Sequence, residues 1–95
     1  MNTDALVIRF SSLGDIVLAG AVTGALGRVT FLTHPRYRTL AALLPGVEQV
    51  LCSGEDPLPR RARQIVDLHS SLRSRQICLQ VRGPVRRVRR HDLRR

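Results

Sequence analysis

Residues 5–26, ALVIRFSSLGDIVLAGAVTGAL, contain the pattern that decides the fold. The β-branched and apolar run over 5–10 predicts a buried strand. A polar turn over 11–14 follows it. Residues 15–26 then place apolar side chains near one face of a helix, which predicts a helix although two glycines weaken it. A strand that leads through a short turn into a helix is typical of a parallel sheet covered by helices.

The rest of the chain continues this alternation. Further strands are predicted at 28–33, 47–53, 64–70 and 85–90, and further helices at 35–44 and 71–81. Residues 54–63 form a polar connection with two prolines. The order predicts an α/β fold: a mostly parallel sheet with helices on both faces, formed as a single domain over residues 1–95.

The charge of the chain is strongly one-sided. All 16 basic residues are arginine, against seven acidic residues, and the formal net charge is +9. This excess favours acidic partners such as phosphates, anionic sugars, nucleic acid or an anionic membrane surface. A GC-rich coding bias explains the absence of lysine equally well. Aromatic residues make up only 3% of the chain, so few side chains could stack on nucleic-acid bases. Nucleic acid is therefore not the expected partner.

The two cysteines, Cys52 and Cys78, are far apart, and no secretory signal precedes them. Together these features predict buried, reduced thiols and a cytoplasmic protein. The apolar run over 15–26 is entered through an acidic residue and is shorter than the ~20 residues that span a bilayer. The histidines and cysteines do not approach metal-ligand spacing, so no metal site is predicted.

Polar and ionisable residues gather in two predicted turns, after the first and fourth strands. Ligands bind beyond the carboxyl ends of the strands in open α/β sheets, so these turns line one crevice if the two strands are neighbours. Asp15 is the sharpest candidate, as a general base that accepts a proton from a substrate hydroxyl. It is also well placed as a helix N-cap or first-turn acid, and the residues alone favour this structural role.

The remaining candidates could bind an anion. Ser11, Ser12 and Gly14 offer hydroxyls and backbone N–H groups at a helix start, although an ordinary polar turn explains them equally well. Arg73 could hold a carboxylate or phosphate by a bidentate contact. The candidates after the fourth strand are Asp67, His69, Ser70, Arg73 and Ser74. A strand-end aspartate, a satisfied histidine and solvated helix residues form an equally good interpretation.

The chain closely resembles the N-terminal domain of the lipopolysaccharide heptosyltransferases of glycosyltransferase family 9. The resemblance lies in ALVIRFSSLGDIVLAGAVTGAL, VTFLTHPRYRTLAALLPGVEQVL and IVDLHSSLRSR, and it extends over about residues 5–95. It implies two Rossmann-like domains in the GT-B arrangement and an inverting, metal-independent transfer of heptose from ADP-heptose to the inner core. It further implies that the ADP-sugar binds a C-terminal donor domain outside these 95 residues, and that this chain needs no cofactor of its own.

The resemblance also implies residue roles. Asp15 falls on the family's general base, a role compatible with its place at a helix start. Ser11, Ser12 and Gly14 fall on the turn that lines the acceptor cleft. Asp67, His69, Arg73 and Ser74 match the second stretch, where basic side chains are expected near an acidic acceptor. The connection SGEDPLPRRAR over 53–63 is shorter than in much of the family.

The implied partners fit the arginine surplus. The acceptor sugar carries a carboxylate on phosphorylated lipid A, so we expect an anionic, lipid-linked acceptor, transient contact with the inner face of the inner membrane, and a donor-domain partner. Without the second wall of the cleft, the chain alone is expected to be inactive. Two alternatives remain: a non-catalytic basic module that contacts anionic lipid or nucleic acid, and an inactive truncated remnant.

Overall fold

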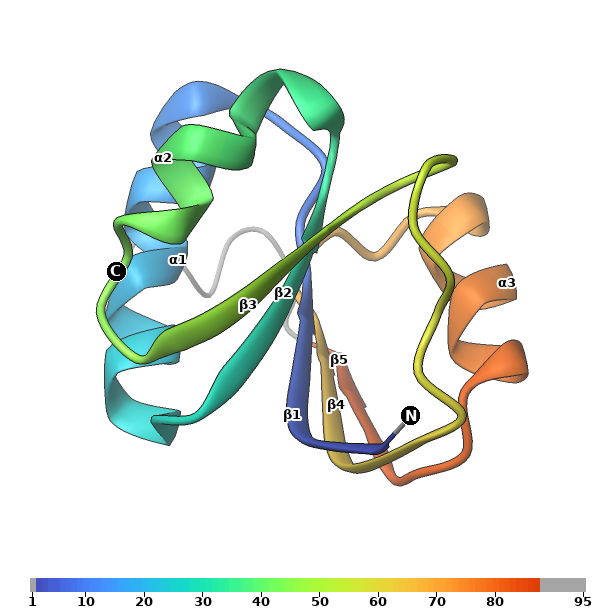
Figure 1. Cartoon of the computed structure of the whole chain (residues 1–95). Helices are drawn as coiled ribbons and strands as arrows, with labels where there is room; N and C mark the ends of the chain where they lie inside the picture. Colours follow the sequence, from blue (N-terminus) through green and yellow to red (C-terminus); the bar gives the residue numbers. More distant parts are fainter. Residues whose placement is uncertain (1, 88–95) are drawn as a thin grey trace.

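The computed structural model describes residues 2–87. Five strands form one all-parallel sheet in the order β3-β2-β1-β4-β5 (Figure 1). The elements are β1 (Asn2–Ile8), α1 (Leu13–Leu26), β2 (Val29–Thr33), the 3-10 turn η1 (Pro35–Tyr37), α2 (Arg38–Ala42), β3 (Val47–Cys52), β4 (Arg61–Asp67), α3 (Leu72–Gln80) and β5 (Val85–Arg87). The predicted α/β class is confirmed, and the strand order is Rossmann-like.

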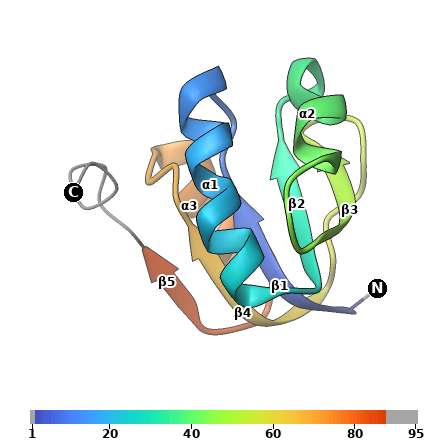
Figure 2. The same cartoon turned by 90° about the vertical axis from the view of Figure 1, so that its left-hand side faces the viewer.

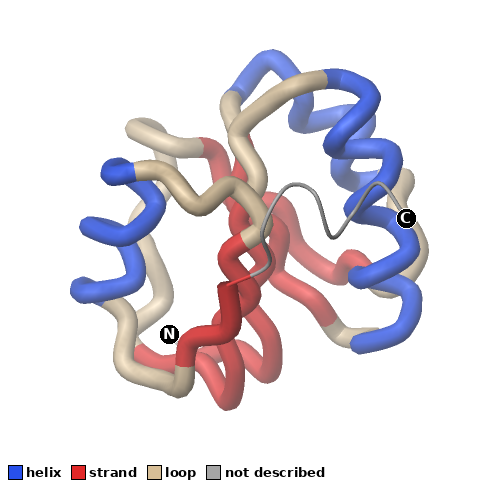
Figure 3. Tube along the Cα trace, turned by 180° about the vertical axis from the view of Figure 1, so that it is seen from behind, coloured by secondary structure: helices blue, strands red, loops and turns tan. Residues whose placement is uncertain are grey.

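Helices cover both faces of the sheet. Figures 1 and 2 show α1 and α2 against one face and α3 against the other, and Figure 3 shows the same layers from behind. Val7 of β1 packs with Ile16 of α1 in one buried cluster. Leu6 and Ile8 of β1 pack with Cys78 of α3 in the second. Because successive side chains of a strand point to opposite faces, an apolar β1 fills both layers and is the central strand.

Two helices differ from their predicted bounds by two or more residues at one end, whereas α3 is one residue shorter at each end. α1 begins at Leu13, two residues before the predicted start, because Ser12 has an extended backbone (φ −95°) and is the N-cap. The predicted helix over 35–44 is divided into η1 and α2. Tyr37 is the last residue of η1 and the N-cap of α2. Its ψ is 13°, so the helical backbone is interrupted there.

The first, fourth and fifth strands also differ. β1 runs over Asn2–Ile8 rather than 5–10. β4 begins at Arg61 rather than at 64, because Arg61 already pairs with Asn2 of β1, and it ends at Asp67. β5 is described over Val85–Arg87, and residues 88–90 of the predicted strand lie outside the described residues. The connection from β3 to β4 crosses the sheet on the α3 side (Figure 1), where Leu58 packs against the α3-side cluster.

The outer face of α1 is apolar. Leu13, Val17 and Leu18 are each more than half exposed. Within residues 2–87, no helix combines the length and apolar character needed to cross a membrane.

Candidate functional site

The turns after β1 and β4 meet at the carboxyl edge of the sheet, as predicted. The backbone N–H of Leu68 donates to the carbonyl of Ile8 over 3.1 Å, and Nη1 of Arg9 donates to the carbonyl of Leu68 over 2.7 Å. The rings of Phe10 and His69 lie edge to face, with centroids 4.9 Å apart. The connections from β1 and β4 lead to helices on opposite faces of the sheet (Figure 1), and such a point is where open α/β sheets bind ligands.

Asp15 is held by a buried arginine that the sequence patterns above did not single out. The Arg9 side chain is 7% exposed, and its Nη2 donates to Oδ2 of Asp15 over 2.6 Å. The hydroxyl of Ser12 donates to the same oxygen over 3.0 Å. A buried guanidinium is costly without a partner, so this pair stabilises the turn as well as placing the carboxylate. The only signal in the sequence is one charge at the end of an apolar run, ALVIRF.

The protonation state of Asp15 follows from these contacts. Burial opposes ionisation, but hydrogen bonds from Arg9 and Ser12 outweigh it and hold the pKa of Asp15 below its ordinary value. The carboxylate is therefore ionised at neutral pH and can accept a proton. Asp15 is also the third residue of α1, where the helix dipole favours a negative charge. Asp15 therefore stabilises the first turn of α1 independently of any chemical role.

Asp67 and Ser74 are engaged with their own turn. Asp67 is fully buried, and its Oδ1 accepts the backbone N–H groups of His69 (3.0 Å) and Ser70 (2.8 Å). Its Oδ2 accepts the hydroxyl of Ser74 over 2.9 Å and lies 3.6 Å from Nε of Arg87. These contacts close the turn after β4 and join it to α3. A role of Asp67 or Ser74 in binding an acceptor stays a prediction, and a ligand would have to displace these bonds.

Arg73 lies beside Phe10. Its guanidinium carbon is 5.3 Å from the centre of the Phe10 ring, and its Nη2 donates to the hydroxyl of Ser53. The same side chain lines a hollow of about 230 Å³ between α3 and the loop after β3. The other lining residues are Leu32, Ser53, Gly54, Asp56, Leu58, Gln76, Ile77 and Gln80.

None of these other lining residues was predicted as a candidate. Gln76 and Gln80 follow Arg73 at i+3 and i+7, a spacing that places all three on one face of a helix. The spacing is visible in the sequence, but the loop that closes the hollow becomes apparent only in the fold. The hollow has amide, hydroxyl, carboxylate and guanidinium groups around a partly apolar wall.

The remaining predicted residues lie nearer the surface. Ser11, Ser12 and Gly14 are exposed at the start of α1. A Cβ at Gly14 would meet nothing within 4 Å, so no close contact requires glycine there. Ser70 has φ 51° in the turn after β4. In the part of the chain that the structure describes, no group of three or more His, Cys, Asp or Glu side chains could hold a metal ion.

His69 is expected to make stability depend on pH. Burial, and then the charge of Arg9, lower its pKa below the ordinary value of 6.5, against smaller opposing effects of Asp67 and Asp15. The unfolded chain then binds more protons, so the free energy of unfolding falls as the pH drops below about 6.5 and through the native pKa. Urea unfolding between pH 7.5 and pH 4.5 should show this loss.

A His69→Gln variant should lose less stability over this pH range than the wild type, because the imidazole that binds a proton on unfolding is absent. Equal slopes in the wild type and His69→Gln would contradict the assignment of this pH dependence to His69.

Comparison with models of known protein families, with curated proteins and with solved structures found no match for this chain. The fold and the site define its class: an all-parallel α/β domain with an ion-paired carboxylate and a polar hollow at the carboxyl edge. Its place in glycosyltransferase family 9 rests on the resemblance of its sequence and stays a prediction.

Proposed function

We propose that the chain is the acceptor-binding half of an inverting glycosyltransferase, which transfers heptose from ADP-heptose to the inner core of lipopolysaccharide. The observation that carries this proposal is the Arg9–Asp15 pair: a carboxylate held in one orientation at the carboxyl edge and still 20% exposed. The motif RFSSLGD, which carries the family resemblance, contains both residues of the pair.

In this proposal Asp15 is the general base. The hydroxyl oxygen of the acceptor attacks the anomeric carbon of the donor, the bond from that carbon to the ADP oxygen breaks, and Asp15 takes the hydroxyl proton. ADP leaves with the bonding electron pair, and the configuration at the carbon inverts. The low pKa of Asp15 makes it a weak base in open solvent, so transfer requires a second domain that closes over it and excludes water.

The residues that line the hollow support an anionic sugar as the ligand. Arg73 is exposed beside the hollow, and a guanidinium can hold a carboxylate through two parallel hydrogen bonds. Gln76, Gln80 and Asp56 add donors and acceptors for hydroxyl groups. Arg73 lies over the Phe10 ring, Phe10 meets His69 edge to face, and Arg9 donates to the carbonyl of Leu68, the residue before His69.

Binding of the acceptor by the chain tests this proposal. We expect a soluble inner-core acceptor that bears a carboxylate sugar to shift the amide NMR signals of residues 9–15 and 68–80 in the ¹⁵N-labelled chain. Arg73→Gln should weaken the Kd about tenfold, because one charge-assisted contact is lost. Arg36→Gln, a change at an exposed arginine of η1, is the control and should bind as the wild type does.

Other outcomes identify the alternatives. Equal weakening in both variants, with binding that falls steeply with salt, would indicate a basic binding module and contradict a specific acceptor site. A folded chain with no acceptor binding at millimolar sugar would agree with an inactive remnant.

A further inference from the structure

The hollow beside Arg73 contains one charge of each sign, and the two charges differ in how they are compensated. Its lining includes the guanidinium of Arg73 and the carboxylate of Asp56. Arg73 lies over the Phe10 ring and donates to the hydroxyl of Ser53. Within residues 2–87, no ion pair joins it to a carboxylate. Asp56 does have a cationic partner, so the net charge of the hollow depends on how far that partner offsets it.

The partner of Asp56 is Arg38, the first residue of α2, which lies outside the hollow. Its Nη2 is 3.6 Å from Oδ2 of Asp56. The guanidinium is held in this orientation because its Nε donates to Sγ of Cys52, a fully buried side chain, over 3.0 Å. Asp56 is fixed in turn, since its Oδ2 accepts the backbone N–H of Cys52 over 2.8 Å. Arg38 therefore offsets the charge of Asp56 without occupying space that a ligand would need.

Arg38 is shared with a second carboxylate. Its Nη2 also lies 3.1 Å from Oε2 of Glu55. Glu55 is exposed and does not line the hollow, so water and salt screen its charge from a ligand there. Asp56 would adjoin the ligand, so its pairing with Arg38 has the larger effect on the charge that a ligand meets.

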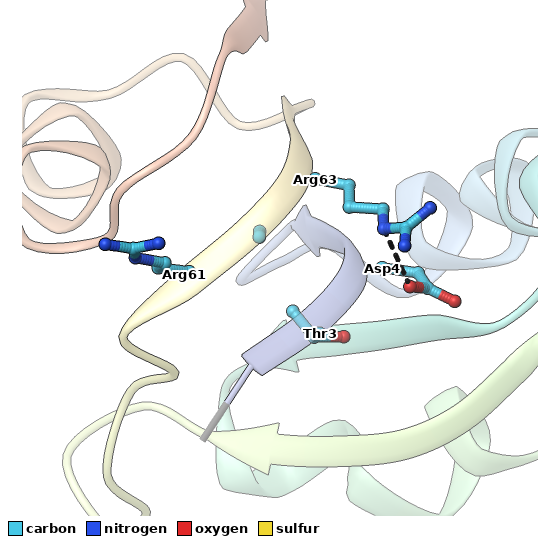
Figure 4. A pocket seen from close by; sticks show the side chains of 5 residues that line it. Thr3, Asp4, Arg61 and Arg63 are labelled. Atoms are coloured by element: carbon cyan, nitrogen blue, oxygen red, sulfur yellow. Dashed lines mark ion pairs between the residues drawn. The ribbon is translucent and has the colours of Figure 1, made fainter.

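A second hollow, at the amino-terminal end of the sheet, has a different arrangement. It has a volume of about 360 Å³ and is lined by Thr3, Asp4, Arg61, Ala62 and Arg63. Arg63 offsets Asp4 from within the lining itself, with its Nε 3.6 Å from Oδ1 (Figure 4). The two arginine–aspartate pairs have the same separation but belong to different hollows, which makes Arg63 a matched control for Arg38.

We propose that Arg38 is a specificity-determining residue, which makes the hollow beside Arg73 select acidic sugars over amino sugars by offsetting Asp56. The inference rests on the proposed function only in taking this hollow as the sugar site. With Arg38 in place, Arg73 provides the net charge of the hollow, and a guanidinium can hold a carboxylate through two hydrogen bonds. Without Arg38, the carboxylate of Asp56 would repel an acidic sugar and attract an ammonium group.

Glucuronate, glucosamine and glucose are the probes, because they share a sugar ring and differ in charge. Their Kd values are measured from the amide NMR shifts of Gln76 and Gln80 in the full ¹⁵N-labelled chain. Arg38→Gln should weaken glucuronate binding about fivefold and strengthen glucosamine binding by a similar factor, because one compensating charge is lost. Binding of uncharged glucose should not change. Arg63→Gln should bind all three sugars as the wild type does.

A double variant, Arg38→Gln with Asp56→Asn, separates charge compensation from support of the loop. An asparagine amide oxygen can still accept the N–H of Cys52, and neither charge of the pair remains. Glucuronate binding should therefore return to within about twofold of the wild type, a coupling that a purely structural role of Arg38 would not produce.

Weaker binding of all three sugars in Arg38→Gln, with no recovery in the double variant, would overturn the proposal. A wild-type chain that binds none of the sugars, or that does not prefer glucuronate to glucosamine, would overturn it as well. Failure of the proposed function would be distinct: sugars would be selected by charge as described, but a protein carrying both domains would transfer no heptose.

Discussion

Under the proposed function, replacing Asp15 with asparagine is expected to lower the rate of heptose transfer by about 10²- to 10⁴-fold, the usual contribution of a positioned general base. Asparagine has nearly the same shape, and its amide oxygen can still accept from Arg9, but it cannot take the proton of the acceptor hydroxyl. The measurement is turnover with ADP-heptose by a protein in which this domain is joined to a donor domain. Binding of the acceptor by the Asp15→Asn variant should remain within a few-fold of wild type.

The Arg9→Gln variant separates the positioning role of Arg9 from the proton transfer by Asp15. Loss of the guanidinium removes a hydrogen bond that lowers the pKa of Asp15, so the pKa should rise toward its ordinary value. The acid limb of the pH–rate profile should then move to higher pH than in the wild type.

For the Asp15→Asn variant, unchanged turnover together with a native unfolding curve would exclude Asp15 as the general base.

Gly46→Ala is expected to lower the free energy of unfolding by about 3 kcal/mol, the sum of left-handed backbone strain and overpacking. Gly46 has φ +81°, and a Cβ placed on it would lie 2.1 Å from the carbonyl oxygen of Thr23 in α1. The turn cannot move away freely, because the carbonyl of Gly46 accepts the N–H of Val29 over 2.8 Å. Urea denaturation followed by circular dichroism measures the loss.

Gly54→Ala is the matched control for this prediction. Gly54 has nearly the same φ, +83°, but a Cβ there would meet nothing within 4 Å. Its substitution should cost only the left-handed backbone term, about 1 kcal/mol. The difference between the two variants isolates the close approach of the turn to α1. Equal losses would mean that the Gly46 turn relaxes around the new methyl group, and that this contact does not limit the packing of α1.

The class of fold could be predicted from the sequence because its signals are local. A β-branched run, a polar turn and an apolar-faced helix can each be recognised within a dozen residues, and their alternation favours a parallel sheet. The same local signals predicted that Asp15 lies at a helix start and that polar residues cluster after β4. The bounds of the elements were harder to predict. The start of α1 depends on the backbone geometry of Ser12, and the start of β4 depends on its pairing with β1.

What the sequence by itself determined, then, is the order and kind of the elements and the edge at which candidate residues collect. The tertiary structure alone decided which charges meet. Arg9 pairs with Asp15, and Asp67 closes its own turn, because of where the turns come together. Hydrophobic periodicity specifies which face of an element is buried, but an ion pair depends on distances between elements that only the folded chain defines.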